Sequence, residues 1–167
     1  RDDFLRRYRA SGLRGHWLHA VYLVNLATPK SDLLVQSIDS LVHYMELAEL
    51  LDADGVVMHP GSHLGAGFTA MRGQIVSALG EVLARAPTSR ARLLIENSAG
   101  SGGCVGCSFE ELGAIVEPFD VARVGVCLDT QHAFASGYDL RDEESVQSTL
   151  AAFERAVGFP RLALVHA

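Results

Sequence analysis

Five short apolar stretches of this chain end in, or just before, a residue that can bind a metal ion. In chain order, these residues are His19, His59, Glu96, Asp129 and His166. Imidazole nitrogens and carboxylate oxygens together suit borderline divalent ions such as zinc and manganese. A single histidine or carboxylate at the end of a strand is more often structural, but a series of five favours one shared metal site. His132, which follows Asp129 by three residues, is a sixth candidate ligand.

A shared site requires that the apolar stretches lie side by side as parallel strands. The sequence predicts strands near His19 and at residues 55–59, 92–96, 123–128 and 162–165. Apolar residues recur at helical spacing around and between them, at residues 2–8, 31–52, 75–83, 109–116 and 145–157. Ser31 and Ser108 are predicted N-caps, and Glu111 is the predicted capping-box partner of Ser108.

Strands and helices thus alternate along the chain, which predicts a parallel sheet with crossover helices. In a parallel barrel the carboxyl ends of all strands meet on one rim, where barrel enzymes carry their active sites. Five such units in 167 residues predict the central part of a (β/α)8 TIM barrel, an α/β fold of typically about 250 residues. We expect residues 1–167 to form a single partial domain of this kind. An open doubly wound sheet is the alternative, but no G-x-G-x-x-G follows a predicted strand.

The composition indicates a globular domain of ordinary size. Hydrophobic residues make up 49% and charged residues 20%, and the net charge of -6 gives no general attraction for nucleic acids. Contacts with phosphates would need bound metals and local arginines instead. No stretch of about 18 apolar residues occurs, so we expect no membrane span. The N-terminus lacks the apolar core of a signal peptide.

The three cysteines, Cys104, Cys107 and Cys127, predict no disulfide framework and fit a reduced, cytoplasmic protein. Cys104 and Cys107 form one C-x-x-C in a glycine-rich loop, without the second pair that a zinc knuckle needs. A redox motif there is a weak alternative. Cys127 is predicted to be an ordinary buried strand residue.

Several motifs make the chain similar to a known family. They are HPGSHL at residues 59–64, IENSAG at residues 95–100 and VCLDTQHAFASGYD at residues 126–139. Together with LHAVYLVNL at residues 18–26, and in this order along nearly the whole chain, they closely resemble endonuclease IV. That family comprises zinc-dependent apurinic/apyrimidinic (AP) endonucleases of base excision repair with a TIM barrel fold.

The resemblance implies a trinuclear zinc cluster, and the imidazole and carboxylate ligands leave manganese as an alternative metal. His19 and His59 would hold one zinc. Glu96, which is also the candidate catalytic residue, would bridge this zinc to a second one. Asp129 and His166 would complete much of the second site.

His132 would belong to the third zinc site of the family. The family also uses an Asp, a His and a Glu from strands and loops beyond the position of His166, and this chain has none of them. We therefore expect a fragment of a longer protein, with weak or no activity on its own.

Tyr22 and Leu23 match loop residues that this family inserts into DNA at an abasic site. The implied partner is double-stranded DNA with abasic sites, and the implied reaction hydrolyses the phosphodiester 5′ to the abasic sugar to leave a 3′-hydroxyl. Metal-activated water would be the nucleophile, so the protein needs to supply none. An abasic nucleotide has no stacked base and costs less to extrude, which gives selectivity. We expect a bacterial-type cytoplasmic enzyme that is monomeric in its full-length form.

Two other functions stay open at the level of sequence. A sugar isomerase or epimerase on a related barrel would use one or two metal ions and a small polyol. The acidic net charge slightly favours that reading, whereas residues 129–132 and the pair Tyr22 and Leu23 favour DNA. The third reading is a non-catalytic fragment that binds zinc or DNA without cutting it.

Overall fold

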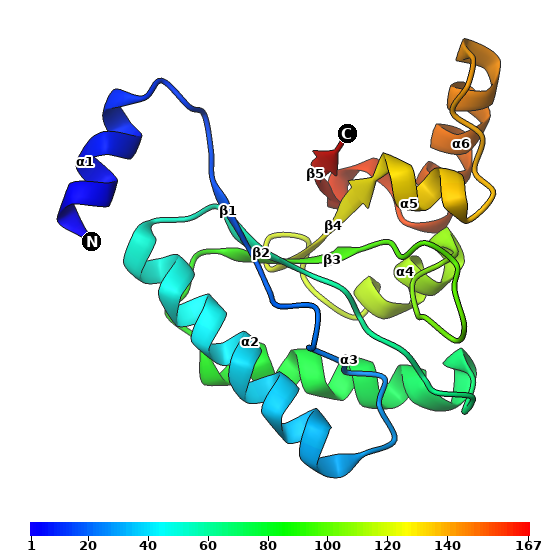
Figure 1. Ribbon diagram of the computed structural model, residues 1–167, viewed down its shortest axis with the longest axis horizontal. Coiled ribbons are helices and arrows are strands. Elements are labelled where there is room, and N and C mark those ends of the chain that lie inside the picture. The colour runs from blue at the N-terminus through cyan, green and yellow to red at the C-terminus, as the bar shows by residue number, and fades with distance from the viewer.

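The computed structural model describes residues 1–167 and contains a five-stranded sheet with helices around it (Figure 1). The strands are β1 (Trp17–His19), β2 (Gly55–Met58), β3 (Arg92–Glu96), β4 (Val124–Asp129) and β5 (Leu162–His166). The helices are α1 (Asp2–Ala10), α2 (Ser31–Leu51), α3 (Phe68–Arg85), α4 (Phe109–Val116), α5 (Thr130–Ala135), α6 (Glu143–Ala156) and the 3-10 helix η1 (Phe159–Arg161). All the predicted strands are present, with ends that differ by at most one residue from the ranges predicted from the sequence. None of the helices has the length and apolar character that a membrane-spanning segment requires.

The strands all run parallel, and their order in the sheet is their order in the sequence, β1-β2-β3-β4-β5. A doubly wound sheet reverses its strand order at a switch point, and this sheet has no such reversal. The order therefore excludes the doubly wound alternative. A sheet that always adds the next strand on the same side is about half of a (β/α)8 barrel, so the predicted fold class is confirmed.

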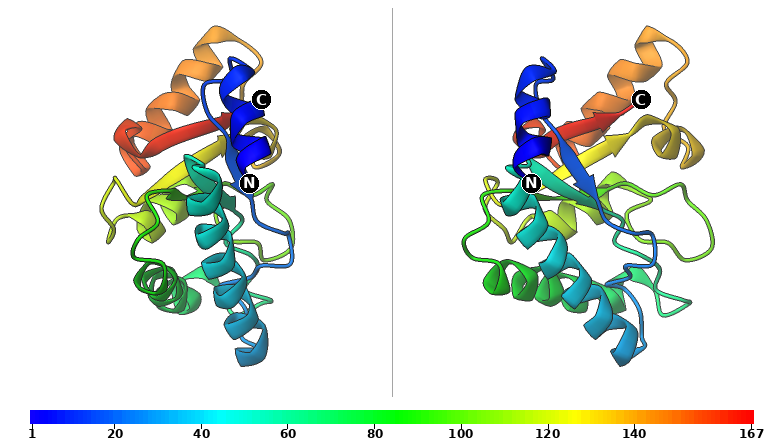
Figure 2. Two further views of the ribbon diagram at one scale, coloured as in Figure 1. Left: turned by 90° about the vertical axis from the view of Figure 1, so that its left-hand side faces the viewer. Right: turned by 60° about the vertical axis from the view of Figure 1, so that its left-hand side comes forward.

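Helices α2, α3 and α4 cover one face of the sheet, and the main hydrophobic core lies beneath them, with Met45 and Ile75 fully buried. Figure 2 shows that α2 and α3 stay on the same side of the strands when the molecule is turned. The opposite face carries only a small apolar cluster of Val57, Leu94 and Cys127. Polar side chains at the strand ends can therefore lie on this second face without displacing the main core.

The sequence predicts no helix at the position of the short helix α5. Asp129 ends β4 and also caps α5, because its Oδ1 accepts a hydrogen bond from the His132 N–H at 2.7 Å. Ser108 caps α4 as predicted and accepts from the Glu111 N–H at 3.2 Å. The predicted capping box is wrong, because the Glu111 carboxylate accepts from the Gly106 N–H instead.

Two further local predictions are wrong. Ser31 is already the first residue of α2, and the N-cap is Lys30, which makes no side-chain capping bond. The cysteines are not all reduced, since Cys104 and Cys107 form a disulfide across a glycine-rich turn that brings their Cα atoms to 6.6 Å. Cys127 is buried and free, as predicted.

Candidate metal centre

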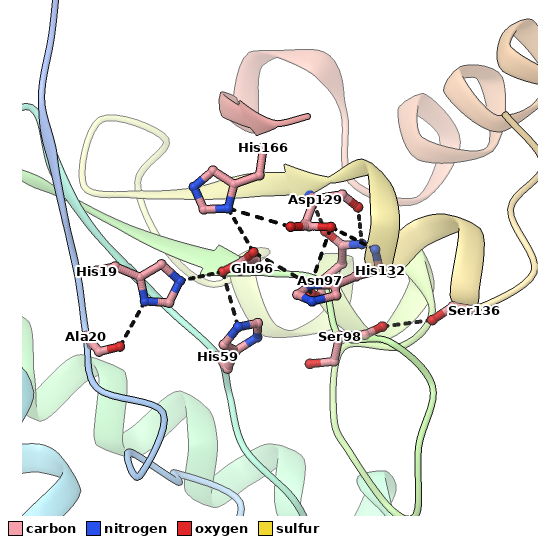
Figure 3. A network of polar contacts seen from close by, with 10 residues as sticks. All are labelled: His19, Ala20, His59, Glu96, Asn97, Ser98, Asp129, His132, Ser136 and His166. Atoms are coloured by element: carbon pink, nitrogen blue, oxygen red, sulfur yellow. Dashed lines mark hydrogen bonds and ion pairs between the residues drawn. The ribbon is translucent and has the colours of Figure 1, made fainter.

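The structure gathers the predicted ligand residues at the carboxyl ends of the strands, around the carboxylate of Glu96 (Figure 3). They come from β1, the residue after β2, β3, the end of β4, α5 and the end of β5, and are His19, His59, Glu96, Asp129, His132 and His166. Parallel strands place these ends on one edge of the sheet. Glu96 is only 1% exposed, so a buried carboxylate lies at the centre of the group.

His19 and His59 both contact one oxygen of Glu96. Nε2 of His19 lies 2.9 Å from Glu96 Oε2, and Nε2 of His59 lies 3.3 Å from the same oxygen. The other ring nitrogen of His19, Nδ1, lies 2.8 Å from the carbonyl oxygen of Ala20. A carbonyl only accepts, so Nδ1 carries a hydrogen and Nε2 is the nitrogen available to a metal. His19, His59 and Glu96 are close enough together to hold one metal ion.

The second oxygen of Glu96 faces residues from the other end of the chain. Nδ1 of His166 lies 2.9 Å from Glu96 Oε1 and 3.8 Å from Asp129 Oδ2. Nδ1 of His132 lies 3.6 Å from both Glu96 Oε1 and Asp129 Oδ1. Glu96, Asp129 and His132 form another group that can hold a metal ion. Glu96 thus offers one oxygen to each side, which is the arrangement that a bridging ligand needs.

Metal ligands must be deprotonated, and the electrostatics of this centre favour that form for Glu96 and His59 but the protonated form for His19. Burial alone would raise the pKa of Glu96, but the hydrogen bond from His19, the nearby His59 and the hydrogen bond from His166 lower that pKa to about 2. Burial lowers the pKa of His59 and so favours its neutral imidazole. The hydrogen bond with Glu96 raises the pKa of His19.

Sequence reasoning missed two residues beside the cluster, Cys127 and Asn97. Cys127 lies close to Glu96 and His166, and alternation along β4 places it on the same face as Asp129, a signal that the sequence does contain. Burial, with the charges of Glu96 and Asp129, raises the pKa of Cys127 to about 12, which favours the thiol form, and Cys127 forms a group with Glu96 and His166 that could hold a metal ion. Asn97 follows Glu96 and bonds to the main chain of Asp129.

Tyr22 and Leu23 lie in the loop after β1 and are 82% and 77% exposed. The ring of Tyr22 meets the imidazole of His59 edge to face, with the ring centroids 5.3 Å apart. Tyr22 therefore lies against the ligand cluster while most of its surface faces solvent. The part that these two residues play in DNA binding stays a prediction.

Sequence comparisons agree with this geometry. The family described as xylose isomerase-like TIM barrel matches residues 1–167. The chain is 41% identical over 150 residues to the probable endonuclease 4 of Halothermothrix orenii, and the match covers 89% of this chain and 54% of that relative. The chain thus spans little more than half the length of this curated relative.

Solved structures give the same result. Endonuclease IV from Thermus thermophilus has a TM-score of 0.83 at 37% identity, over 99% of this chain and 57% of that one. A D-tagatose 3-epimerase-like protein has a TM-score of 0.80 at 20% identity, over 99% of this chain and 60% of that one. The second likeness shows the fold alone, because its identity is low. The resemblance to endonuclease IV predicted from the sequence is confirmed.

Proposed function

This chain belongs to the xylose isomerase-like TIM barrel family, and we propose that it is part of a metal-dependent deoxyribonuclease of base excision repair. The substrate would be double-stranded DNA with abasic sites, and the reaction would hydrolyse the phosphodiester 5′ to the abasic sugar and leave a 3′-hydroxyl. The observation that carries the proposal is the convergence of four imidazoles and a second carboxylate on the buried Glu96. The likeness to endonucleases from two organisms supports DNA as the substrate.

Zinc would be held on both sides of Glu96. His19 and His59 would share one ion with it, and Asp129 and His166 would share a second. The donor set fits zinc, because imidazole nitrogens and carboxylate oxygens converge within contact distance on a carboxylate that is 1% exposed. Bound zinc would supply Lewis acidity that lowers the pKa of water and stabilises charge on the attacking and leaving oxygens. Manganese is the alternative metal.

The third zinc of the family would use His132, which lies at the edge of the cluster in α5. The only carboxylate oxygens within 4 Å of its ring nitrogens are those of Glu96 and Asp129. Because the second zinc would already use both of these carboxylates, we expect the chain alone to hold a third ion weakly, and to cleave DNA weakly or not at all.

The protein's own side chains would prepare the DNA for hydrolysis. Glu96 stays ionised and orients the imidazoles around it, so the reacting phosphate would meet a fixed cluster. Tyr22 and Leu23 are exposed beside His59 and could fill the space that a missing base leaves in the duplex. An ordinary nucleotide would have to be unstacked first, which costs a few kcal/mol and gives selectivity for abasic sites.

The test is cleavage of a 5′-labelled duplex that carries one tetrahydrofuran abasic analogue. The 167-residue chain and a form extended at both ends would be incubated with zinc, and the products separated on a denaturing gel. We expect the extended form to cut 5′ to the analogue and to leave an end that a DNA polymerase extends. Glu96→Ala should reduce cleavage by more than about 100-fold, because one residue serves both sides of the centre.

The matched control is His43→Ala, which removes an exposed imidazole of α2 away from the cluster. This variant should cut as well as the unchanged protein. The same duplex without the analogue should stay intact. If the extended form instead epimerises or isomerises a ketose and leaves the abasic duplex uncut, the sugar enzyme reading is correct. Zinc binding without either activity would support the non-catalytic reading.

A further inference from the structure

Asn97 is 2% exposed and lies at the point where the pairing of β3 and β4 ends. Its side-chain amide makes two hydrogen bonds to one residue on the neighbouring strand, Asp129. Nδ2 donates to the Asp129 carbonyl at 2.9 Å, and Oδ1 accepts from the Asp129 N–H at 2.7 Å (Figure 3). The side chain thus continues the ladder between the strands by one step, because the main-chain N–H of Asn97 reaches only the Cys127 carbonyl, at 3.4 Å.

The main chain of Asn97 also contacts His132. The Asn97 carbonyl oxygen lies 3.0 Å from His132 Nδ1. A carbonyl oxygen can only accept, so this hydrogen bond needs a proton on Nδ1 and leaves the lone pair on Nε2. Asp129 links the two residues, since its Oδ1 accepts from the His132 N–H at 2.7 Å. Asn97 therefore contacts both candidate ligands, Asp129 through its side chain and His132 through its main-chain carbonyl, and Nε2 is the nitrogen of His132 that is available to a metal.

We propose that Asn97 is a positioning residue that fixes Asp129 and His132 as metal ligands through paired contacts with the backbone of one and the imidazole of the other. The inference rests on the metal centre of the proposed function. Two neighbouring residues of that centre would have different roles. Glu96 would bind the metal, and its neighbour in sequence would hold two further ligands in place without touching the ion.

Residues that hydrogen-bond to metal ligands influence how tightly the site binds its metal. Hydrogen bonds to ligating imidazoles and carboxylates fix their orientation, and their loss typically costs about 10- to 100-fold in metal affinity. Asn97 is well suited to this task because it is buried and both polar atoms of its amide are bonded. Asp129 sits at the junction of β4 and α5, where a small rotation of the backbone would turn its carboxylate away from Glu96.

The effect should be confined to one side of the centre. His19 and His59 come from β1 and the segment after β2, and Asn97 makes no hydrogen bond to either. His19 is oriented by its own bond to the Ala20 carbonyl, at 2.8 Å. Loss of the Asn97 side chain should therefore weaken metal binding by Asp129 directly. It should affect His132 only through Asp129, whose carboxylate accepts from the His132 N–H, and it should leave the other side intact.

The experiment compares Asn97→Ala and Asn97→Asp with the unchanged chain. Metal-free protein is titrated with zinc against a coloured chelator, and the visible spectrum of bound cobalt reports the ligands of each site. We expect Asn97→Ala to lose about 10- to 100-fold in affinity at one class of site, with the other class unchanged. Asn97→Asp keeps the acceptor for the Asp129 N–H and the side-chain volume, but it places a carboxylate oxygen against the Asp129 carbonyl, so it should weaken the same class of site at least as much.

Gln74→Ala is the matched control. The Gln74 side chain also makes two hydrogen bonds to main-chain groups, the carbonyls of Leu26 and Thr28, both at 2.8 Å. It belongs to α3 and contacts no candidate ligand. This variant should lose a similar amount of thermal stability in the metal-free state and bind zinc as the unchanged chain does.

The outcomes separate this inference from the proposed function. Unchanged zinc affinity in both Asn97 variants, with lower thermal stability of the metal-free protein, would mean a purely structural role and overturn the inference. Equal weakening of both classes of site would also overturn it. Selective weakening in a protein that never cuts abasic DNA would support the positioning role while the proposed nuclease activity fails.

Discussion

The two ends of β3 both carry a charged residue with buried atoms, and the fold treats them in opposite ways. At the carboxyl end, Glu96 is surrounded by imidazoles, with His19 and His166 at 2.9 Å from its two oxygens. At the amino end, Nε and Nη2 of Arg92 are buried without any hydrogen-bond partner. Both residues project to the same face of the sheet, because they are an even number of positions apart in one strand.

Another arginine near the amino ends of the strands also lacks hydrogen-bond acceptors. Nε and Nη2 of Arg123, just before β4, are also buried and unpartnered. Arg161 is different, since its guanidinium donates to the carbonyls of Phe119 and Val124, at 2.9 and 3.3 Å. Burial, together with the nearby Arg161, lowers the pKa of Arg92. A buried charge alone therefore does not mark a functional site in this protein, whereas convergence of complementary groups on the charge does.

The largest expected effect is on zinc affinity and comes from removing the charge of Glu96, at the carboxyl end of β3. Glu96→Gln keeps the volume of the side chain but removes the negative charge that both halves of the centre share. Zinc affinity should fall by more than about 100-fold, because loss of a metal ligand weakens binding more than loss of a residue that only hydrogen-bonds to a ligand. Zinc content after gel filtration and a chelator competition titration measure the change.

The control for this prediction lies at the other end of the same strand. Arg92→Met should leave zinc affinity unchanged, since Arg92 makes no contact with the ligand cluster. Equal zinc affinity in Glu96→Gln and the unchanged protein would show that the convergence on Glu96 is not a metal site.

The sequence predicts most of the scaffold because its signals are periodic and local. Helix α2 repeats apolar residues over several turns, and β3 is a continuous apolar run that ends in Glu96. The parallel arrangement then follows, and it brings the ligand residues together. Helix α5 was missed because six residues are too few to show a helical period. Its cap, Asp129, was predicted only as a ligand.

Contacts that depend on the fold cannot be predicted in this way. The partner of the Asn97 side chain lies 32 residues away, so only the pairing of β3 with β4 identifies it. The unpartnered nitrogens of Arg92 are equally invisible in the sequence, where an arginine at the start of a strand is usually taken to be solvated. The disulfide between Cys104 and Cys107 depends on the turn of their loop.

A smaller effect, on the free energy of unfolding, is expected when a methyl group is added next to the Arg92 side chain. A Cβ on Gly125 of β4 would lie 2.5 Å from Arg92 Nη2 and 2.9 Å from the Arg161 carbonyl oxygen. Gly125→Ala should therefore lower the free energy of unfolding by about 1–3 kcal/mol, measured by urea denaturation. Adding Arg92→Ala should restore only part of the loss, because the Arg161 carbonyl stays in place. Full stability of Gly125→Ala would show that the Arg161 carbonyl and the Arg92 side chain both shift at little cost, so that the buried position of Arg92 is not fixed.

The smallest expected effect is an increase in stability. Arg92→Met should raise the free energy of unfolding by about 1 kcal/mol, because it removes two buried nitrogens that have no acceptor and keeps much of the apolar stem. Arg161→Met is the matched control and should destabilise the protein, since it leaves the carbonyls of Phe119 and Val124 without their donor. Urea midpoints of the two variants measure both signs. If Arg92→Met is destabilised as much as Arg161→Met, Arg92 has a partner in solution and the contrast between the two ends of β3 fails. If the two variants change the free energy of unfolding in opposite directions, the unpartnered charge of Arg92 destabilises the fold. The charge of Glu96 differs because imidazoles surround it.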